Sequence, residues 1–348
     1  MNEIFQAIRE IVSEKQPEND ISELLFRHNC FYLLSLMKTE NKWTALAKNT
    51  VTFNHIAAKE KMKALSPFLK RADFPYAIIK GPVLSQGAYG SCGFRKSGDL
   101  DLLVAKESWK AARACLLDAG FVQGKLENDA IVPYSSKEKI FYSAFTHQYA
   151  PFLKATANPF CPFVNVDINI SVLWGEADFS IDESSFLQNL QPAEIAGFSC
   201  MKLEPYHEFI ALCLHHYKDM NSIYLLSAGP ISLKLFCDIY FYLRNNKLDP
   251  EELNQRCAAL GVAEYIYYCI YFTNIIFASN QLDTFLNEMK TEKAEEFIPC
   301  FGLNKKEQKI WKISFADRIF ALDFKEKFLD ALTQEDFDKI DKNNRFLT

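Results

Sequence analysis

The sequence predicts an α+β fold, in which N-terminal helices and a C-terminal helical bundle flank a small mixed β-sheet. Phenylalanine occurs 30 times among 348 residues and glycine only 12 times, a composition that favours packed helices over loops. Runs with strand character lie in the middle of the chain, and apolar residues recur at helical spacing on either side of them. We therefore expect an N-terminal helical region at 1–70, a sheet-containing core at 71–202 and a C-terminal helical domain at 203–348.

The first region is expected to be helical throughout. Ile4, Ile8 and Ile11 recur at helical spacing. Further helices are predicted at ISELLFRH, at NCFYLLSLM and from about 43 to 65. The charged run KEKMK at 59–63 is interpreted as a solvated helix face, with contact to an RNA as the alternative.

The core region alternates short strands, helices and a glycine-containing loop. In FPYAIIKGP a buried strand ends at Lys80-Gly81, and Pro82 suits the first turn of the helix that follows, where its missing N–H costs nothing. The loop at 90–98 contains three glycines. The elements predicted are strands at 76–79, 100–104, 121–123 and 142–149, and helices at 82–89 and 107–119.

The clearest strand is FVNVDINISV at 163–172, where apolar and polar residues alternate. Val164, Val166, Ile168, Ile170 and Val172 form one row, and Asn165, Asp167, Asn169 and Ser171 form the other. Burial of the apolar row would fix the register of the strand and leave Asp167 on the polar face.

Charge and composition exclude several classes of protein. The net charge of −5 weighs against nonspecific wrapping of nucleic acid, because proteins that coat it are usually basic. The ten cysteines form no C-x-x-C pair and lie mostly in apolar stretches, which indicates reduced core thiols. The N-terminus resembles an amphipathic helix and not a signal peptide, and the most apolar run, 265–278, is too short to cross a bilayer. We therefore expect a cytoplasmic protein with no membrane partner.

Two carboxylates lie two residues apart in SGDLDLLV. On a strand, Asp99 and Asp101 point to the same face, and two like charges so close raise a pKa unless a cation lies between them. A D-x-D pair by itself is more often solvated than metal-binding. Asp167, on the polar face of a second strand, offers a third oxygen ligand of the kind Mg²⁺ prefers, which favours a metal site.

Cationic residues precede the carboxylate pair. The turn at Lys80-Gly81 leads into a helix, and the free N–H groups of a helix N-terminus bind anions. Lys80 and Arg95 add contacts suited to phosphates, and Ser97 lies close to the pair. Acidic ligands beside a phosphate-sized cationic cradle suit phosphoryl or nucleotidyl transfer, in which two metal ions clamp the attacking and leaving oxygens. The chain has no P-loop and no protein-kinase motif, which argues against those two classes.

The segments IIKGPVLSQGAYG, FRKSGDLDLLV and VDINISVLW resemble the polymerase-beta-like nucleotidyltransferase superfamily. More closely, the chain resembles the bacterial family of uncharacterised nucleotidyltransferases, from about residue 20 to 245. The resemblance implies that Asp99, Asp101 and Asp167 bind Mg²⁺ or Mn²⁺, with Asp101 bridging two ions and Asp167 helping to activate the incoming nucleophile.

The resemblance also implies the substrate contacts. Gly81 would let the triphosphate approach the helix start, and Lys80, Arg95 and Ser97 would contact phosphate. The implied reaction transfers NMP from an NTP, such as ATP, to an acceptor, with release of pyrophosphate. The acceptor is left open between an RNA end such as that of tRNA, a protein side chain and a small molecule. The alternative is a catalytically decayed nucleotidyltransferase fold that serves as a binding or scaffold protein.

Two residues of the C-terminal helices complete the candidates. His215 is expected to face the nucleotide, as the family pattern implies, or to be a histidine at the edge of the core, and His216 is expected at the surface. Asp238 lies in an apolar helix, where a structural role is expected, either in a pair with Lys234 or in support of the histidine-containing helix.

Overall fold

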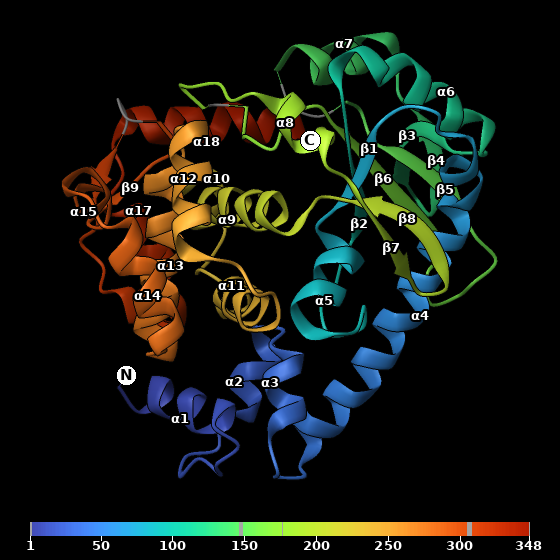
Figure 1. The fold of residues 1–348 in the computed structure, drawn as a ribbon. Helices are drawn as coiled ribbons and strands as arrows, with labels where there is room; N and C mark the ends of the chain where they lie inside the picture. Colours follow the sequence, from blue (N-terminus) through green and yellow to red (C-terminus); the bar gives the residue numbers. More distant parts are fainter. Residues whose placement is uncertain (1, 146–148, 176, 305–307, 348) are drawn as a thin grey trace.

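The computed structural model describes residues 2–145, 149–175, 177–304 and 308–347. Within them, a six-stranded mixed sheet occupies one side of the molecule and the C-terminal helices occupy the other, with helix α9 (Pro205–Asn221) running between the two (Figure 1). The first three helices of the chain lie below both parts in this view, and the fourth rises along the side of the sheet. The predicted α+β class is therefore confirmed. No helix in the described ranges is both long and apolar enough to cross a membrane.

The N-terminal region is helical, as predicted. It consists of α1 (Asn2–Val12), α2 (Ser22–Arg27), α3 (Phe31–Leu36) and α4 (Lys42–Arg71). Helix α4 begins with a capping box, in which the Asn41 side chain accepts hydrogen bonds from the backbone N–H groups of Trp43 and Thr44. It extends beyond the predicted end near residue 65 and continues through Pro67. The final turns of α4 reach the sheet, against which Leu65 and Phe68 are buried.

The sheet has the strand order β1-β2-β6-β5-β3-β4. Its strands are β1 (Tyr76–Ile79), β2 (Asp99–Val104), β3 (Val122–Glu127), β4 (Ala130–Pro133), β5 (Phe152–Ala155) and β6 (Phe163–Asn169). Strands β2 and β6 are parallel and the other neighbouring pairs are antiparallel. Between the strands lie α5 (Gly81–Tyr89), η1 (Lys106–Ser108), α6 (Trp109–Asp118) and α7 (Ser136–Phe145), and the hairpin of β7 (Gln191–Ile195) and β8 (Phe198–Lys202) follows α8 (Glu183–Gln188).

Two strand predictions are wrong in part. Residues 142–145 of the predicted strand 142–149 belong to α7, and residues 146–148 lie outside the described part of the chain. The helix is favoured by a capping box, in which Ser135 and Glu138 bond to one another's backbone N–H groups. Strand β6 ends at Asn169, so Val172 does not continue the apolar row of the strand. Its side chain packs instead against the hydrophobic cluster that contains the C-terminal helices.

The two faces of the sheet contact different hydrophobic clusters. Leu100, Leu102 and Val166 lie in a cluster with α4 and α6, which we call the sheet core. Ile79 and Leu103 lie in a larger cluster with the C-terminal helices, which we call the helical core. Because side chains alternate along a strand, the face of β2 that carries Asp99, Asp101 and Leu103 is the one turned toward the C-terminal helices.

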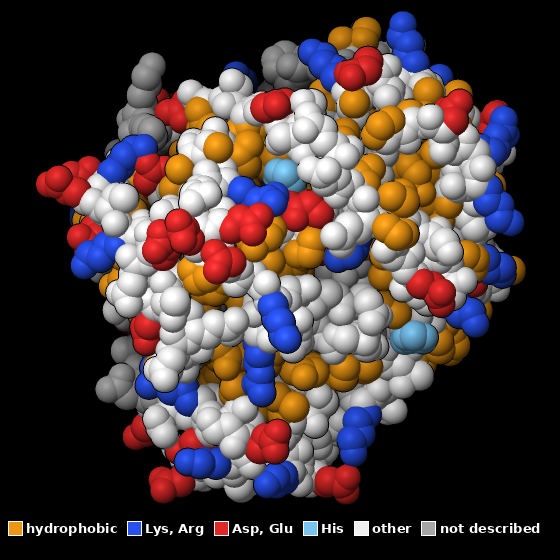
Figure 2. Space-filling view, in the orientation of Figure 1, with side chains coloured by type: hydrophobic (Ala, Val, Ile, Leu, Met, Phe, Trp, Pro, Cys, Tyr) orange, Lys and Arg blue, Asp and Glu red, His pale blue; other side chains and the backbone are white. Residues whose placement is uncertain are grey.

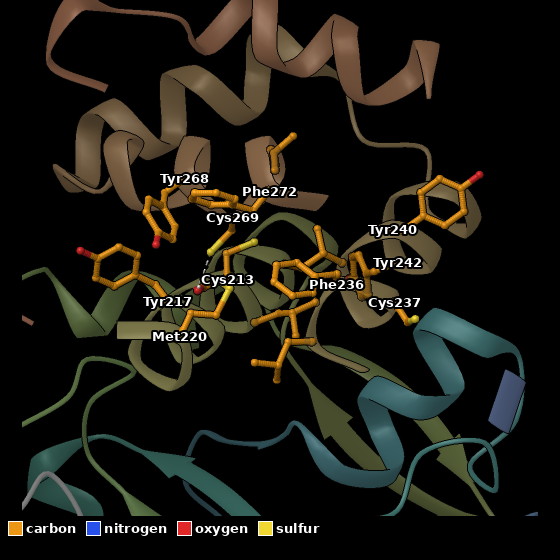
Figure 3. Packing of buried hydrophobic residues seen from close by; sticks show 14 of the residues in the cluster. Cys213, Tyr217, Met220, Phe236, Cys237, Tyr240, Tyr242, Tyr268, Cys269 and Phe272 are labelled. Carbon is orange, nitrogen blue, oxygen red and sulfur yellow. Dashed lines mark hydrogen bonds between the residues drawn. The ribbon is translucent and has the colours of Figure 1, made fainter. Parts of the chain in front are cut away.

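The C-terminal helices form the helical core. They are α9, α10 (Ile223–Leu226), α11 (Leu233–Asn245), α12 (Pro250–Leu260), α13 (Ala263–Phe277), α14 (Asn280–Met289), α15 (Glu292–Phe297), α16 (Phe315–Phe320), α17 (Phe324–Leu329) and α18 (Gln334–Leu347). Figure 3 shows their packing, with Tyr217 and Met220 facing Tyr268, Cys269 and Phe272 across two helices. The prediction of helices to the end misses one short hairpin, β9 (Cys300–Phe301) with β10 (Lys309–Ile310). The helical core also includes residues of α1 and α3, so both flanking helical regions share it.

Candidate active site

The three predicted acidic ligands lie side by side at one edge of the sheet. Strands β2 and β6 pair in a parallel register in which Asp101 lies directly opposite Asp167, and Asp99 lies opposite Asn165. Opposed residues of paired strands point to the same face, so all three carboxylates face the C-terminal helices. The structure therefore brings the pair Asp99 and Asp101 together with Asp167, which lies more than 60 residues later in the chain.

Two neighbours hold the Asp101 carboxylate. Its Oδ1 accepts a hydrogen bond from Asn169 Nδ2 at 3.1 Å and lies 3.3 Å from Lys80 Nζ. Asp101 is 5% exposed and Asn169 is 1% exposed, so the contacts are shielded from water. Among the described residues, Lys80 is the one cationic side chain that lies within 4 Å of any of the three carboxylates. Three carboxylates and one ammonium leave the group with an excess of negative charge, which a divalent cation would offset.

Asp167 is the least compensated of the three. Its Oδ1 is buried without a hydrogen-bond partner among the described residues. Burial raises the pKa of Asp167 to about 7, and the negative charges of Asp101 and Asp99 add to the rise. Burial also raises the pKa of Asp99, again with a contribution from Asp101. Three neighbouring carboxylates, one with an unpartnered buried oxygen, are donors of the kind that a hard divalent cation prefers. In the described residues, Asp99, Asp101 and Asp167 do not offer three ligand atoms within 4.8 Å of one another, so their fit to an ion rests on their chemistry and not on a preformed site.

The predicted turn after β1 brings a helix N-terminus against the same strand. Lys80 has φ 57° and Gly81 has φ 49°, both in the left-handed region that favours glycine. A Cβ atom on Gly81 would lie 3.1 Å from Ser97 Oγ and 3.5 Å from the carbonyl oxygen of Asp99. Ser97 Oγ donates a hydrogen bond to that carbonyl oxygen at 2.6 Å. Pro82 occupies the first turn of α5, as predicted.

Arg95 differs most from its predicted setting. Its guanidinium is buried and its Nε lies 2.9 Å from Asp238 Oδ2. The Asp238 carboxylate, which is 0% exposed, also accepts a hydrogen bond from Tyr89 Oη at 2.6 Å and lies 3.1 Å from His216 Nε2. The ion-pair partner of Asp238 is thus Arg95 and not Lys234, while its expected support of the histidine-containing helix is observed. The prediction of phosphate contact stays open for the remaining guanidinium nitrogens of Arg95.

The two histidines of α9 have different settings. His216 was expected at the surface, which is wrong, because its ring is fully buried and bonded to Asp238. His215 is half-buried and lines a pocket together with Lys80, Asn169 and Lys218. Burial first, and then the positive charges of Lys80 and Lys218, lower the pKa of His215 well below its ordinary value, so this ring is neutral.

The carboxylates of Asp99, Asp101 and Asp167, which we call the acidic row, lie in a part of the chain that matches a known family. A family model described as uncharacterised nucleotidyltransferase matches residues 18–278. This chain belongs to that family. The match extends from near the start of α2 to the end of α13 and includes every candidate site residue. Membership supports a nucleotidyltransferase-like function. No curated protein and no solved structure matches the chain.

Sequence reasoning missed two residues of the candidate site. Asn169 was placed on the polar face of its strand but given no role, although its spacing of two from Asp167 predicts that the two share a face. Lys61 belongs to the run interpreted as a solvated helix face, which is wrong for this residue. Lys61 is 4% exposed, and its Nζ donates a hydrogen bond to the backbone oxygen of Ser97.

Two histidines and one aspartate form a second cluster of possible metal ligands. One ligand atom each from His215, His216 and Asp219 lies within 4.8 Å of the others. His215 Nε2 is 3.4 Å from Asp219 Oδ2, and His216 Nε2 is bonded to Asp238, while His216 Nδ1 is buried without a hydrogen-bond partner among the described residues. The Lys80 and Lys218 charges that act on His215 would repel a metal ion there. This cluster is therefore unfavourable for a metal ion on electrostatic grounds.

The charge pattern of the surface bears on the acceptor. On the face drawn in Figure 2, Lys and Arg side chains alternate with Asp and Glu side chains and form no broad area of one sign. A protein that binds nucleic acid along its backbone usually presents a basic patch. This face therefore offers no extended track for a nucleic acid, which agrees with the net charge of −5.

Proposed function

We propose that this protein is a Mg²⁺-dependent nucleotidyltransferase, which transfers NMP from an NTP to an acceptor and releases pyrophosphate. The observation that carries the proposal is the direct opposition of Asp101 and Asp167 on parallel strands, beside Asp99 and Lys80. Family membership supports the same class of reaction.

The acidic residues have distinct roles in the proposal. Asp99 and Asp101 would hold the ion that binds the triphosphate, and Asp101 and Asp167 would hold a second ion near the acceptor. Bound Mg²⁺, or Mn²⁺ in its place, supplies stabilisation of the negative charge on the attacking and leaving oxygens. Asn169 fixes one oxygen of Asp101 through its hydrogen bond, which leaves the other oxygen for a ligand. Lys80 offsets part of the carboxylate charge before the ions bind.

The substrates approach the acidic row from two sides. The triphosphate lies at the first turn of α5, where the absence of a side chain at Gly81 lets the backbone lie close to Ser97 and Asp99. The pocket lined by Lys80, His215 and Lys218 adjoins the end of β6 and admits the acceptor or the nucleoside part of the substrate. The acceptor is an RNA end, a protein side chain or a small molecule. The choice of base in the NTP is made in the same pocket, and ATP is among the candidate substrates. The proposed location is the cytoplasm.

The test is a transfer assay with each α-labelled NTP, Mg²⁺ and a fractionated cell extract. Wild-type protein is expected to move label into one fraction, and the nature of that fraction identifies the acceptor class. Asp101→Asn should abolish the transfer, since it removes a charge from both ion sites. Asp129→Asn is the matched control, because Asp129 is exposed in the β3–β4 turn and has a φ of 58° that asparagine tolerates.

Unchanged transfer in Asp101→Asn would refute the assignment of the site. A protein that binds neither Mg²⁺ nor any NTP in calorimetry would instead be a decayed member of the fold. The unpartnered oxygen of Asp167 argues against decay, because a lost metal site has no reason to keep an uncompensated buried carboxylate.

A further inference from the structure

Lys61 is a buried cation without a carboxylate partner. It lies in the part of α4 that covers the sheet, between the buried residues Ala58 and Met62, and is 4% exposed. Its Nζ donates one hydrogen bond, to the backbone oxygen of Ser97. Among the described residues, no carboxylate oxygen lies within 4 Å of this ammonium, although Asp99 is near enough to favour its charged form. Burial lowers the pKa of Lys61, which reflects the cost of holding the charge out of water.

A cavity opens beside this ammonium. It is lined by Lys61, Asn54, Pro82, Cys92, Arg95 and Ser97. These residues come from α4, from the loop before β2 and from the first turn of α5, whose free N–H groups favour anions. Since Gly81 lies against Ser97 and Asp99, the cavity adjoins the first residue of the acidic row.

A buried ammonium with no counter-ion is unfavourable, and an uncharged residue could fill the same space. An anionic ligand in the cavity would supply the missing counter-ion. Arg95 lines the same cavity, but its charge is already matched by Asp238. Of the two cationic side chains that line the cavity, Lys61 is therefore the one without a carboxylate contact among the described residues.

We propose that Lys61 is a phosphate-binding residue and that the cavity takes the terminal phosphates of the NTP. This proposal rests on the proposed function and adds to it a contact from the N-terminal helical region. The Lys61 ammonium neutralises part of the triphosphate charge on the side away from the acidic row. The hydrogen bond to Ser97 holds the ammonium against the loop that leads into Asp99.

The test compares Lys61→Met with the wild-type protein in calorimetric titrations with tripolyphosphate at constant Mg²⁺. We expect at least a tenfold loss of tripolyphosphate affinity. The ligand-free variant should unfold at the same temperature as the wild type or at a higher one, because an uncompensated charge has been removed. Lys59→Met is the matched control, since Lys59 is exposed on the same helix, and it should change neither quantity. An affinity within twofold of the wild type would overturn the proposal.

A second measurement does not depend on the folding of a variant. Wild-type protein is labelled with acetic anhydride with and without Mg²⁺-tripolyphosphate, and the acetylation of each lysine is followed by mass spectrometry. The ligand should slow the labelling of Lys61 several-fold and leave Lys59 unchanged, and equal labelling of Lys61 overturns the assignment. If the wild-type protein binds neither tripolyphosphate nor any NTP, the proposed function itself fails. If it binds them and Lys61→Met binds them equally, only the role of Lys61 fails.

Discussion

Replacement of Asp167 by asparagine is expected to stabilise the metal-free protein at alkaline pH. The pKa of Asp167 is raised from 3.8 to about 7, mainly by burial and further by Asp101 and Asp99. The folded state therefore binds a proton at a higher pH than the unfolded state does. The ionised carboxylate destabilises the fold fully above pH 7, and this penalty disappears as the pH falls toward 4.

The size of the effect follows from the shift in pKa. One pKa unit corresponds to about 1.4 kcal/mol, so a rise of about three units sets a ceiling of roughly 4 kcal/mol on the penalty at pH 8. The asparagine also loses the favourable charge interaction with Lys80 and a hydrogen bond with Asn165. We expect a net stabilisation of about 1–3 kcal/mol for Asp167→Asn at pH 8, and little or none at pH 5.

Urea unfolding in the presence of a chelator measures this difference directly at the two pH values. Asp129→Asn, the exposed control, should unfold like the wild type at both. Addition of Mg²⁺ should reverse the order of stability at pH 8, because an ion at about 100 times its dissociation constant stabilises the wild type by about 2.7 kcal/mol and the variant by much less. The reasoning is refuted if Asp167→Asn is less stable than the wild type in chelator at pH 8, or if Mg²⁺ stabilises both proteins equally.

Two further substitutions test the surroundings of the acidic row. Asp238→Ala should lower the free energy of unfolding by about 3–5 kcal/mol in urea titrations, because it leaves the buried guanidinium of Arg95 without a counter-ion. A loss below about 1 kcal/mol would contradict this, since it would show that water compensates the charge. Gly81→Ala should cost about 1–2 kcal/mol of stability, because the φ of Gly81 is 49°. It should also weaken NTP binding in calorimetry, because the added Cβ would displace Ser97 Oγ. Unchanged NTP affinity would remove this turn from the nucleotide site.

The acidic row could be predicted because each part of it is a local pattern. Strand periodicity places Asp99 with Asp101 and isolates Asp167 on a polar face, and the alternation around residue 167 admits one register with a buried apolar row. The turn at Lys80-Gly81 was predictable for the same reason, because Gly81 and Pro82 are neighbouring residues whose backbone preferences favour a turn into a helix. What the patterns do not contain is the pairing of β2 with β6, which fixes the distance between the carboxylates.

Contacts between distant segments could not be predicted. Arg95 and Asp238 are separated by 143 residues, and nothing near either position indicates the other, so each was given a partner or a ligand from its own neighbourhood. Lys61 looked solvated because it alternates with other charged residues in KEKMK. Its burial depends on where α4 crosses the sheet, which is a property of the tertiary fold. His216 was misplaced because helical spacing alone does not show which side of α9 meets the helical core.

The loop before β2 is where the three regions of the chain meet, and its contacts explain how the acidic row is held. Lys61 of α4 binds the backbone of Ser97, and Asp238 of α11 binds the guanidinium of Arg95. The loop between these two contacts leads directly into Asp99, so its position depends on helices from both ends of the chain. Since those helices share the helical core, a change of packing there would be transmitted to the first carboxylate. The flanking helices therefore do more than cover the sheet, because they fix the geometry on which the proposed metal site depends.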